Sequence, residues 1–201
     1  FREGLRMARW SSAILVAFIG VIAAGCALPI SGVARDAQGL VAVSRLPASF
    51  SRCENGKSRL QCRAVPFRSL GRLENGMSGL AFVGSNLYYT SVSYSAQHEL
   101  RQVVENFTID DTGRVMPGPC APLLVPLFAD DERRAQGLSA LAYDPERKVL
   151  YLAKRSDKAR LFAAQLDAKS CPTGNFIDLH PPQTLPDYAA IAYSAKRQTL
   201  Y

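Results

Sequence analysis

The chain has 201 residues, of which 48% are apolar and 20% charged, and its formal net charge is +7. This composition indicates a globular protein with a packed core and excludes disordered and collagen-like chains. Basic residues are interrupted by acidic ones, as in the segments 131–136 and 154–160, so they predict a solvated surface and no nucleic-acid partner.

The N-terminal segment has the layout of a secretory signal. Arg2, Arg6 and Arg9 precede an apolar run over residues 13–24, and small residues then lead to Cys26. This pattern predicts a lipoprotein signal peptide over residues 1–25 and a lipid on Cys26 that binds the chain to a membrane. A retained membrane helix and secretion without a lipid are the alternatives. All three export the chain, and the expected location is the bacterial cell envelope, at the outer membrane in a Gram-negative host.

The other four cysteines also indicate export. Cys53 and Cys62 enclose a short polar segment, which predicts a local disulfide, and Cys120 would then pair with Cys171. The second pair follows two acidic turns, at positions that look comparable in successive repeats. A zinc site is the alternative, but the chain has no Cys-x-x-Cys spacing and only two isolated histidines. We assign residues 26–69 to an N-terminal linker and first strands that carry Cys53 and Cys62.

An internal repeat organises the rest of the chain. The segments 76–82, 137–143 and 187–193 align, and each is followed by a polar turn and a second run of aromatic and branched residues. Third-strand candidates follow at 99–110 and 159–168. The spacing predicts an all-β chain with blades of an incomplete β-propeller over residues 70–201, about three in number, with more expected beyond Tyr201. A β-sandwich or another repeat β fold is the alternative.

Ser139 lies in one of these repeats and raises the question of a nucleophile. A nucleophile elbow requires Gly-x-Ser-x-Gly, whereas the last position here is Leu141. The aligned positions in the other copies are Ser78 and Ala189, so the series predicts an architectural role for Ser139. No catalytic residue is assigned.

Two further patterns suggest sites outside the repeat motif. Asp110 and Asp111 resemble the start of a calcium loop, but the remaining ligands of such a loop are missing, so we expect a hairpin turn. The segment 106–108 matches a glycosylation acceptor at Asn106 by pattern.

The loops that lead into the innermost strands supply the candidate ligand-binding residues. In a propeller these loops converge on the central channel, and here they carry Glu74, Gln136 and Asp187. The two carboxylates could bind a divalent cation or act as general bases, whereas the alternative is that they are solvated loop charges.

The motif that begins at Gly137 and the segment 159–167 together carry a family resemblance. The chain resembles exported bacterial propellers of the phytase-like and esterase-like kinds, and the wider lactonase-like and NHL-type propellers, over residues 70–201. The resemblance implies a propeller and, for the phytase-like kind, a Ca²⁺-dependent hydrolase. Phytase-like propellers often have an acidic residue in this motif, where the present chain has Gln136 and Tyr188. We therefore expect a lipid-anchored binding or scaffolding propeller, with a hydrolase of phosphorylated or ester substrates as the alternative.

Overall fold

The computed structural model describes nine stretches of the chain, namely residues 30–44, 48–55, 60–65, 73, 77–96, 99–125, 138–154, 160–179 and 190–201. Within these stretches, no helix combines the length and the apolar character needed to cross a membrane. Cys26 and the predicted signal segment lie outside the described residues.

The chain folds into successive antiparallel sheets, each built from strands that follow one another in sequence. The first sheet contains β1 (Ile30–Asp36), β2 (Gly39–Ser44), β3 (Ser49–Asn55) and β4 (Leu60–Val65). The second contains β5 (Met77–Gly84), β6 (Leu87–Ala96), β7 (Glu99–Ile109) and β8 (Val115–Pro117), with β9 (Leu123–Leu124) also paired to β7. The third contains β10 (Leu138–Asp144), β11 (Val149–Lys154), β12 (Arg160–Leu166) and β13 (Pro172–Leu179), and β14 (Tyr193–Ser194) with β15 (Thr199–Leu200) begins a fourth.

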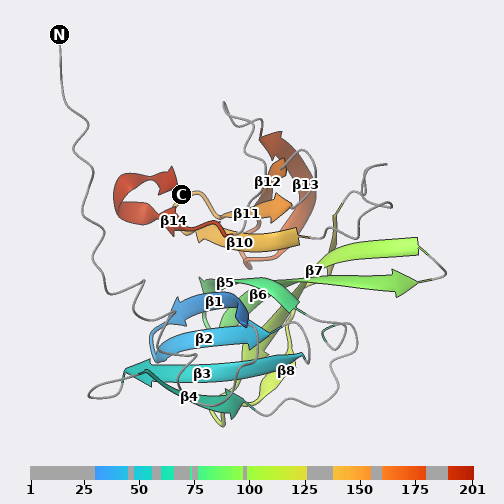
Figure 1. Cartoon of the computed structure of the whole chain (residues 1–201). Helices are drawn as coiled ribbons and strands as arrows, with labels where there is room; N and C mark the ends of the chain where they lie inside the picture. The colour runs from blue at the N-terminus through green and yellow to red at the C-terminus, as the bar shows by residue number, and fades with distance from the viewer. Residues whose placement is uncertain are drawn as a thin grey trace, which may run out of the picture.

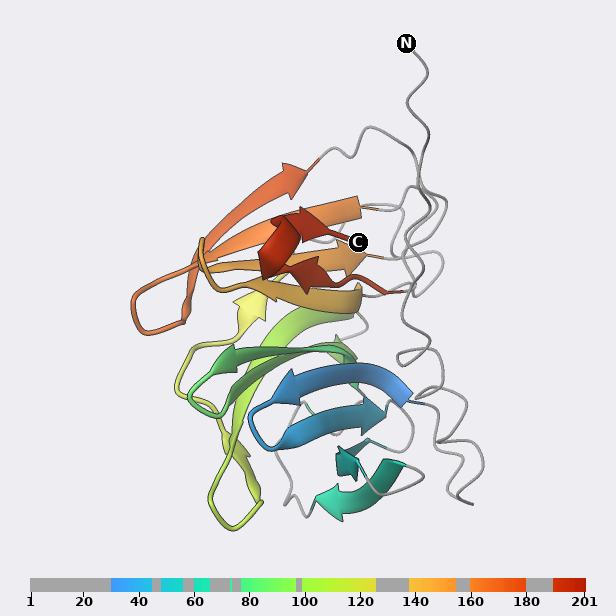
Figure 2. The same cartoon turned by 90° about the vertical axis from the view of Figure 1, so that its left-hand side faces the viewer.

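The sheets are arranged as blades around a common axis (Figures 1 and 2). The first strand of each sheet lies innermost, because β5 contacts β1 on one side and β10 on the other, and β14 contacts β10. The successive sheets and their adjacent first strands confirm the predicted all-β, propeller-like fold. The described residues form two four-stranded blades, a five-stranded blade between them and a two-stranded fourth sheet.

The first blade begins with a copy of the repeat that the sequence analysis did not recognise. Its strand reads ISGVARD from Ile30, against MSGLAFV from Met77 and LSALAYD from Leu138. The copy is hard to see because Arg35 replaces the aromatic residue of the other copies. The interval from Ile30 to Met77 is 77 − 30 = 47 residues, which is typical of one propeller blade.

The inner strands share a β-bulge and a very close approach of their backbones. The pairing register shifts between Ile30 and Gly32, between Ser78 and Leu80, and between Leu138 and Ala140. A Cβ atom on Gly32 would lie 2.5 Å from the carbonyl carbon of Gly79, and one on Gly79 would lie 2.9 Å from Cα of Ala140. Only small residues fit there, which explains the Gly-Gly-Ala series at equivalent positions.

Side chains on the two faces of each blade form the cores between neighbouring blades. In β6, Tyr88 packs toward the first blade and Tyr89 toward the third, and both are fully buried. Phe107 stacks on Tyr88 with ring centroids 5.2 Å apart and meets Phe50 of the first blade edge-on at 4.8 Å. These ring contacts add to the burial energy of the junction between the first two blades.

The close approach at Gly79 can be tested by adding a single methyl group. Gly79 has φ of +68° and no room for a Cβ, whereas Gly113 has φ of +79° and no atom within 4 Å of a Cβ. Gly113→Ala should cost about 1 kcal/mol for the left-handed backbone, and Gly79→Ala about 3 kcal/mol, because overpacking is added. Equal losses of unfolding free energy in urea would contradict the close contact of β5 with β10.

Candidate functional site

The three predicted channel residues, Glu74, Gln136 and Asp187, all lie outside the described residues, so their role stays a prediction. The strands that follow these loops can be located. The hydroxyl of Ser31 contacts the carbonyl oxygen of Met77, and Gly32 faces Gly79, so β1 and β5 run side by side in the same direction. The inner strands therefore begin at one face of the molecule, which we call the inlet face.

The repeated serine at the start of the inner strands has a structural contact. Ser139 Oγ lies 3.3 Å from the carbonyl oxygen of Ala153 in β11, and Ser31 Oγ lies 3.2 Å from that of Val43 in β2. The Ser139 hydroxyl thus donates to the neighbouring strand of its own blade at the bulge. The Ser31 hydroxyl lies between two backbone carbonyl oxygens, that of Val43 in its own blade and, closer at 2.5 Å, that of Met77 in the next. These backbone contacts support the architectural role expected for Ser139.

The predicted calcium-like segment at Asp110 forms a hairpin turn. Asp110 Oδ1 accepts hydrogen bonds from the backbone N–H groups of Thr112 and Arg114, both at 2.9 Å, and from the Thr112 hydroxyl at 2.7 Å. These bonds, led by that from Arg114, lower the pKa of Asp110. Across the described part of the chain, no group of three or more His, Cys, Asp or Glu side chains is placed to bind a metal ion.

The third blade repeats this turn at Asp167. Its Oδ1 accepts from the N–H groups of Lys169 and Cys171, both at 2.8 Å. Cys171 thus stands four residues after the turn aspartate, at the position of Arg114 in the second blade. Cys120 lies six residues further along than Arg114, which corrects the expectation that the two cysteines occupy comparable places in their repeats.

A buried charged cluster joins the first and second blades. Asp36, at the end of β1, has a side chain that is 4% exposed and lies 2.9 Å from Arg52 Nη1. It accepts a hydrogen bond from the Gln38 N–H at 2.8 Å and another from the Tyr88 hydroxyl of the second blade. Burial alone would raise the pKa of Asp36, but the bonds from Tyr88 and Gln38 and the charge of Arg52 hold it below its usual value.

Asp144 occupies the same place in the third blade. Its Oδ1 accepts from the N–H groups of Glu146 at 2.9 Å and Arg147 at 3.1 Å, and the residue is fully buried. Asp144 also influences the Tyr193 hydroxyl of the fourth blade, whose pKa is raised by burial and by Asp144. Unlike Tyr88 and Asp36, these two residues form no hydrogen bond with each other, because Asp144 Oδ2 and the Tyr193 hydroxyl have no hydrogen-bond partner among the described groups.

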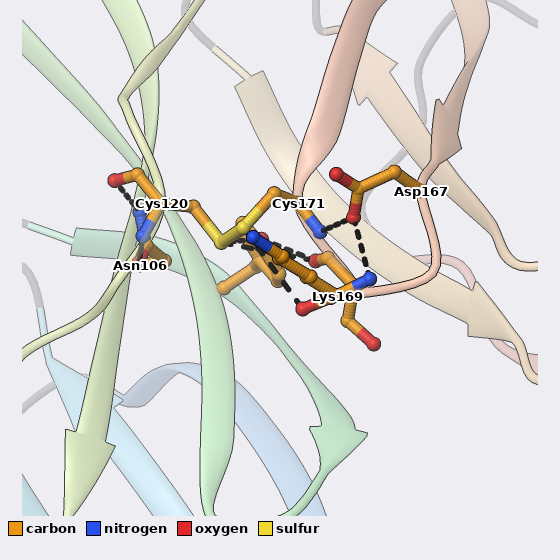
Figure 3. The surroundings of a disulfide bond; sticks show 7 residues. Asn106, Cys120, Asp167, Lys169 and Cys171 are labelled. Atoms are coloured by element: carbon orange, nitrogen blue, oxygen red, sulfur yellow. Dashed lines mark hydrogen bonds between the residues drawn. A yellow bond between two sulfur atoms is a disulfide. The ribbon is translucent and has the colours of Figure 1, made fainter.

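The junction between the second and third blades has a disulfide in place of such an Asp–Tyr contact. The second blade has Val83 and Gly84 where the other two have aspartate. The bond between Cys120 and Cys171, with Cα atoms 5.3 Å apart, connects the segment after β8 to the start of β13 (Figure 3). Because the bond closes a long loop and so restricts the unfolded chain, we expect it to stabilise the folded protein by about 4 kcal/mol.

The second disulfide joins neighbouring strands of the first blade. Cys53 of β3 and Cys62 of β4 are directly paired, with Cα atoms 4.0 Å apart. Because the loop is short, the expected stabilisation is smaller, about 3 kcal/mol. The structure therefore contains both cysteine pairs that the sequence analysis expected.

Asn106 holds the loop that carries Cys120. Its Nδ2 donates to the carbonyl oxygen of Cys120 at 2.7 Å, and its Oδ1 accepts from the Cys120 N–H at 2.9 Å. A Cβ on Gly118 would collide with this amide. Asn106 is 6% exposed and uses both amide atoms, so the folded chain offers no glycosylation acceptor at this position.

Comparisons with solved structures give several structural neighbours, one of which is described here. No protein family and no curated protein matches the sequence. The described neighbour is the crystal structure of a proposed 6-phosphogluconolactonase from Bacteroides fragilis, with a TM-score of 0.46 and 13% sequence identity. The match covers 79% of this chain and 40% of that protein.

The buried cluster at Asp36 predicts a pH-dependent contribution to stability. Because the pKa of Asp36 is lowered on folding, its contribution is complete above the unfolded pKa and is lost as the pH falls through the folded value. Asp36→Asn should reduce the unfolding free energy by about 2 kcal/mol at neutral pH, and by less at about pH 3.

Urea denaturation at both pH values measures this difference. Asp111→Asn is the control, because Asp111 is an exposed turn residue and should have little effect at either pH. A loss that stays the same at both pH values would contradict a stabilising carboxylate at position 36.

Proposed function

We propose that this chain is a β-propeller of the bacterial cell envelope, anchored by a lipid on Cys26 and acting as a binding or scaffolding module. The two disulfides are the observation that carries the proposal. One lies inside the first blade and the other joins the second blade to the third. Bonds of this kind persist in oxidising compartments outside the cytoplasm and are rare inside it.

The short distance along the chain from Cys26 to β1 supports an orientation for the anchored protein. Ile30, the first residue of β1, is four residues after Cys26, and four extended residues span at most about 14 Å. Because β1 begins at the inlet face, a lipid on Cys26 would hold that face toward the membrane. This orientation suits a ligand or protein partner that is itself membrane-bound.

The alternative is a hydrolase of phosphorylated or ester substrates, as the resemblance to phytase-like and esterase-like propellers implies. The binding module and the hydrolase predict different results for the purified protein. A binding module leaves phosphate monoesters and simple esters intact with or without added Ca²⁺, whereas sustained turnover would favour the hydrolase.

The anchor is tested by replacing its lipidated residue. Cys26→Ser should remove lipid incorporation and shift the protein from the membrane fraction to the soluble exported fraction, measured by fatty-acid labelling and fractionation. Peptide mapping without reductant serves as the control, because both disulfides should form in the variant as in the parent. Unchanged labelling and fractionation would contradict the lipid anchor.

A further inference from the structure

The two sulfur atoms of the inter-blade disulfide have different surroundings. Cys120 is 9% exposed and belongs to the core between the second and third blades. Cys171 is only partly buried, at the edge of that core, where the chain leaves the Asp167 turn and enters β13. A thiol from solvent therefore has easier access to the Cys171 side of the bond.

A hydrogen-bond donor lies beside the buried sulfur. The Tyr89 hydroxyl donates to the carbonyl oxygen of Ser170 at 2.7 Å and lies 3.2 Å from Sγ of Cys120. Its single proton can serve either acceptor. Burial, with the nearby charge of Asp167 as a smaller cause, raises the pKa of Tyr89, so the hydroxyl keeps this proton.

Both cysteines are also held in place without the bond. Asn106 of the second blade binds the backbone N–H and carbonyl of Cys120, and Asp167 of the third blade accepts from the Cys171 N–H. Figure 3 shows these two side chains on opposite sides of the disulfide. Because each anchor belongs to the same blade as its cysteine, the reduced thiols would remain close enough to be oxidised again.

We propose that Cys120–Cys171 is a site of reversible thiol–disulfide exchange, attacked at Cys171 by the dithiol of a protein reductant, with Cys120 as the leaving group. The same conclusion holds whether or not Cys26 carries a lipid, because it rests on residues of the folded blades alone.

The exchange proceeds in two displacements. A thiolate of the dithiol attacks Sγ of Cys171, the bond to Cys120 breaks, and its electron pair leaves on Sγ of Cys120, to which Tyr89 can donate. The second thiol of the reductant, as its thiolate, then attacks the mixed disulfide and releases Cys171. Two electrons pass to the cysteine pair, both thiolates take up protons, and the reductant becomes a disulfide.

Reduction would loosen the outer part of one junction and leave its centre intact. The bond connects the outer strands of the second and third blades, whereas the contact of Gly79 with Ala140 joins their inner strands. The exchange is therefore expected to change the rim of the propeller without unfolding the blades.

Trapping with glutathione tests the direction of attack. Glutathione has one thiol, so the first mixed disulfide accumulates when the oxidised protein is incubated with it, quenched in acid and alkylated with N-ethylmaleimide. Peptide mass spectrometry should find glutathione on Cys171 and the alkyl group on Cys120. The reverse pattern, or equal labelling of both cysteines, would overturn the proposal.

Two matched tyrosine variants test whether the Tyr89 hydroxyl assists the departure of Cys120. Tyr89→Phe removes the donor and should slow the formation of the mixed disulfide roughly fivefold, the effect of one ordinary hydrogen bond. Tyr88→Phe removes an equally buried hydroxyl from the opposite face of the same strand and should not slow it. If exchange instead required the junction between the second and third blades to open, Tyr89→Phe would accelerate it, and that result would contradict the assigned role of Tyr89. The trapping pattern of the unaltered protein keeps the proposal testable if a variant does not fold.

Discussion

The architecture depends on how closely the backbones of the inner strands approach one another. At the level of the bulge, Gly32 faces Gly79 and Gly79 faces Ala140, with no room for a larger side chain between the first two. Three backbones in contact bring the blades close enough for their faces to share cores, so that both Tyr88 and Tyr89 are buried although they point in opposite directions. The small residue in each repeat is therefore required by packing, and the hydroxyls of Ser31 and Ser139 beside it contact backbone carbonyl oxygens at the bulge.

Away from the axis, each junction between blades contains either a polar contact or a disulfide bond. An aspartate at the end of an inner strand meets a tyrosine of the next blade at the first and third junctions, through Asp36 and Asp144. The second junction lacks this aspartate and has the Cys120–Cys171 bond, beside which Tyr89 reaches the turn of the next blade. A buried carboxylate depends on its partners for stability, and a disulfide depends on the redox state of its surroundings. The junctions therefore respond to different changes of environment.

The sequence predicted those features that recur in it or depend on local spacing. Three copies of the strand motif indicated the propeller, but the copy at Ile30 was missed because Arg35 replaces the aromatic residue of the motif. Asp110 was correctly expected to form a turn, since the groups that donate hydrogen bonds to its side chain lie within four residues of it. The bond of Asp36 to Tyr88 could not be predicted, because it joins residues 52 positions apart and depends on how one blade is rotated against the next. Burial of Asn106 likewise follows only from the folded path of residues 118–120. The roles of Glu74, Gln136 and Asp187 remain sequence-based expectations.

The nuclear Overhauser effect measures the contact between the inner strands directly in solution. We expect cross-peaks between the α protons of Gly32 and the backbone of Gly79, and between the α protons of Gly79 and the α proton of Ala140, all between residues of different sheets. Cross-peaks from Gly32 and Gly79 that reach only strands of their own sheets, β2 and β6, would contradict the arrangement of the blades around a shared axis.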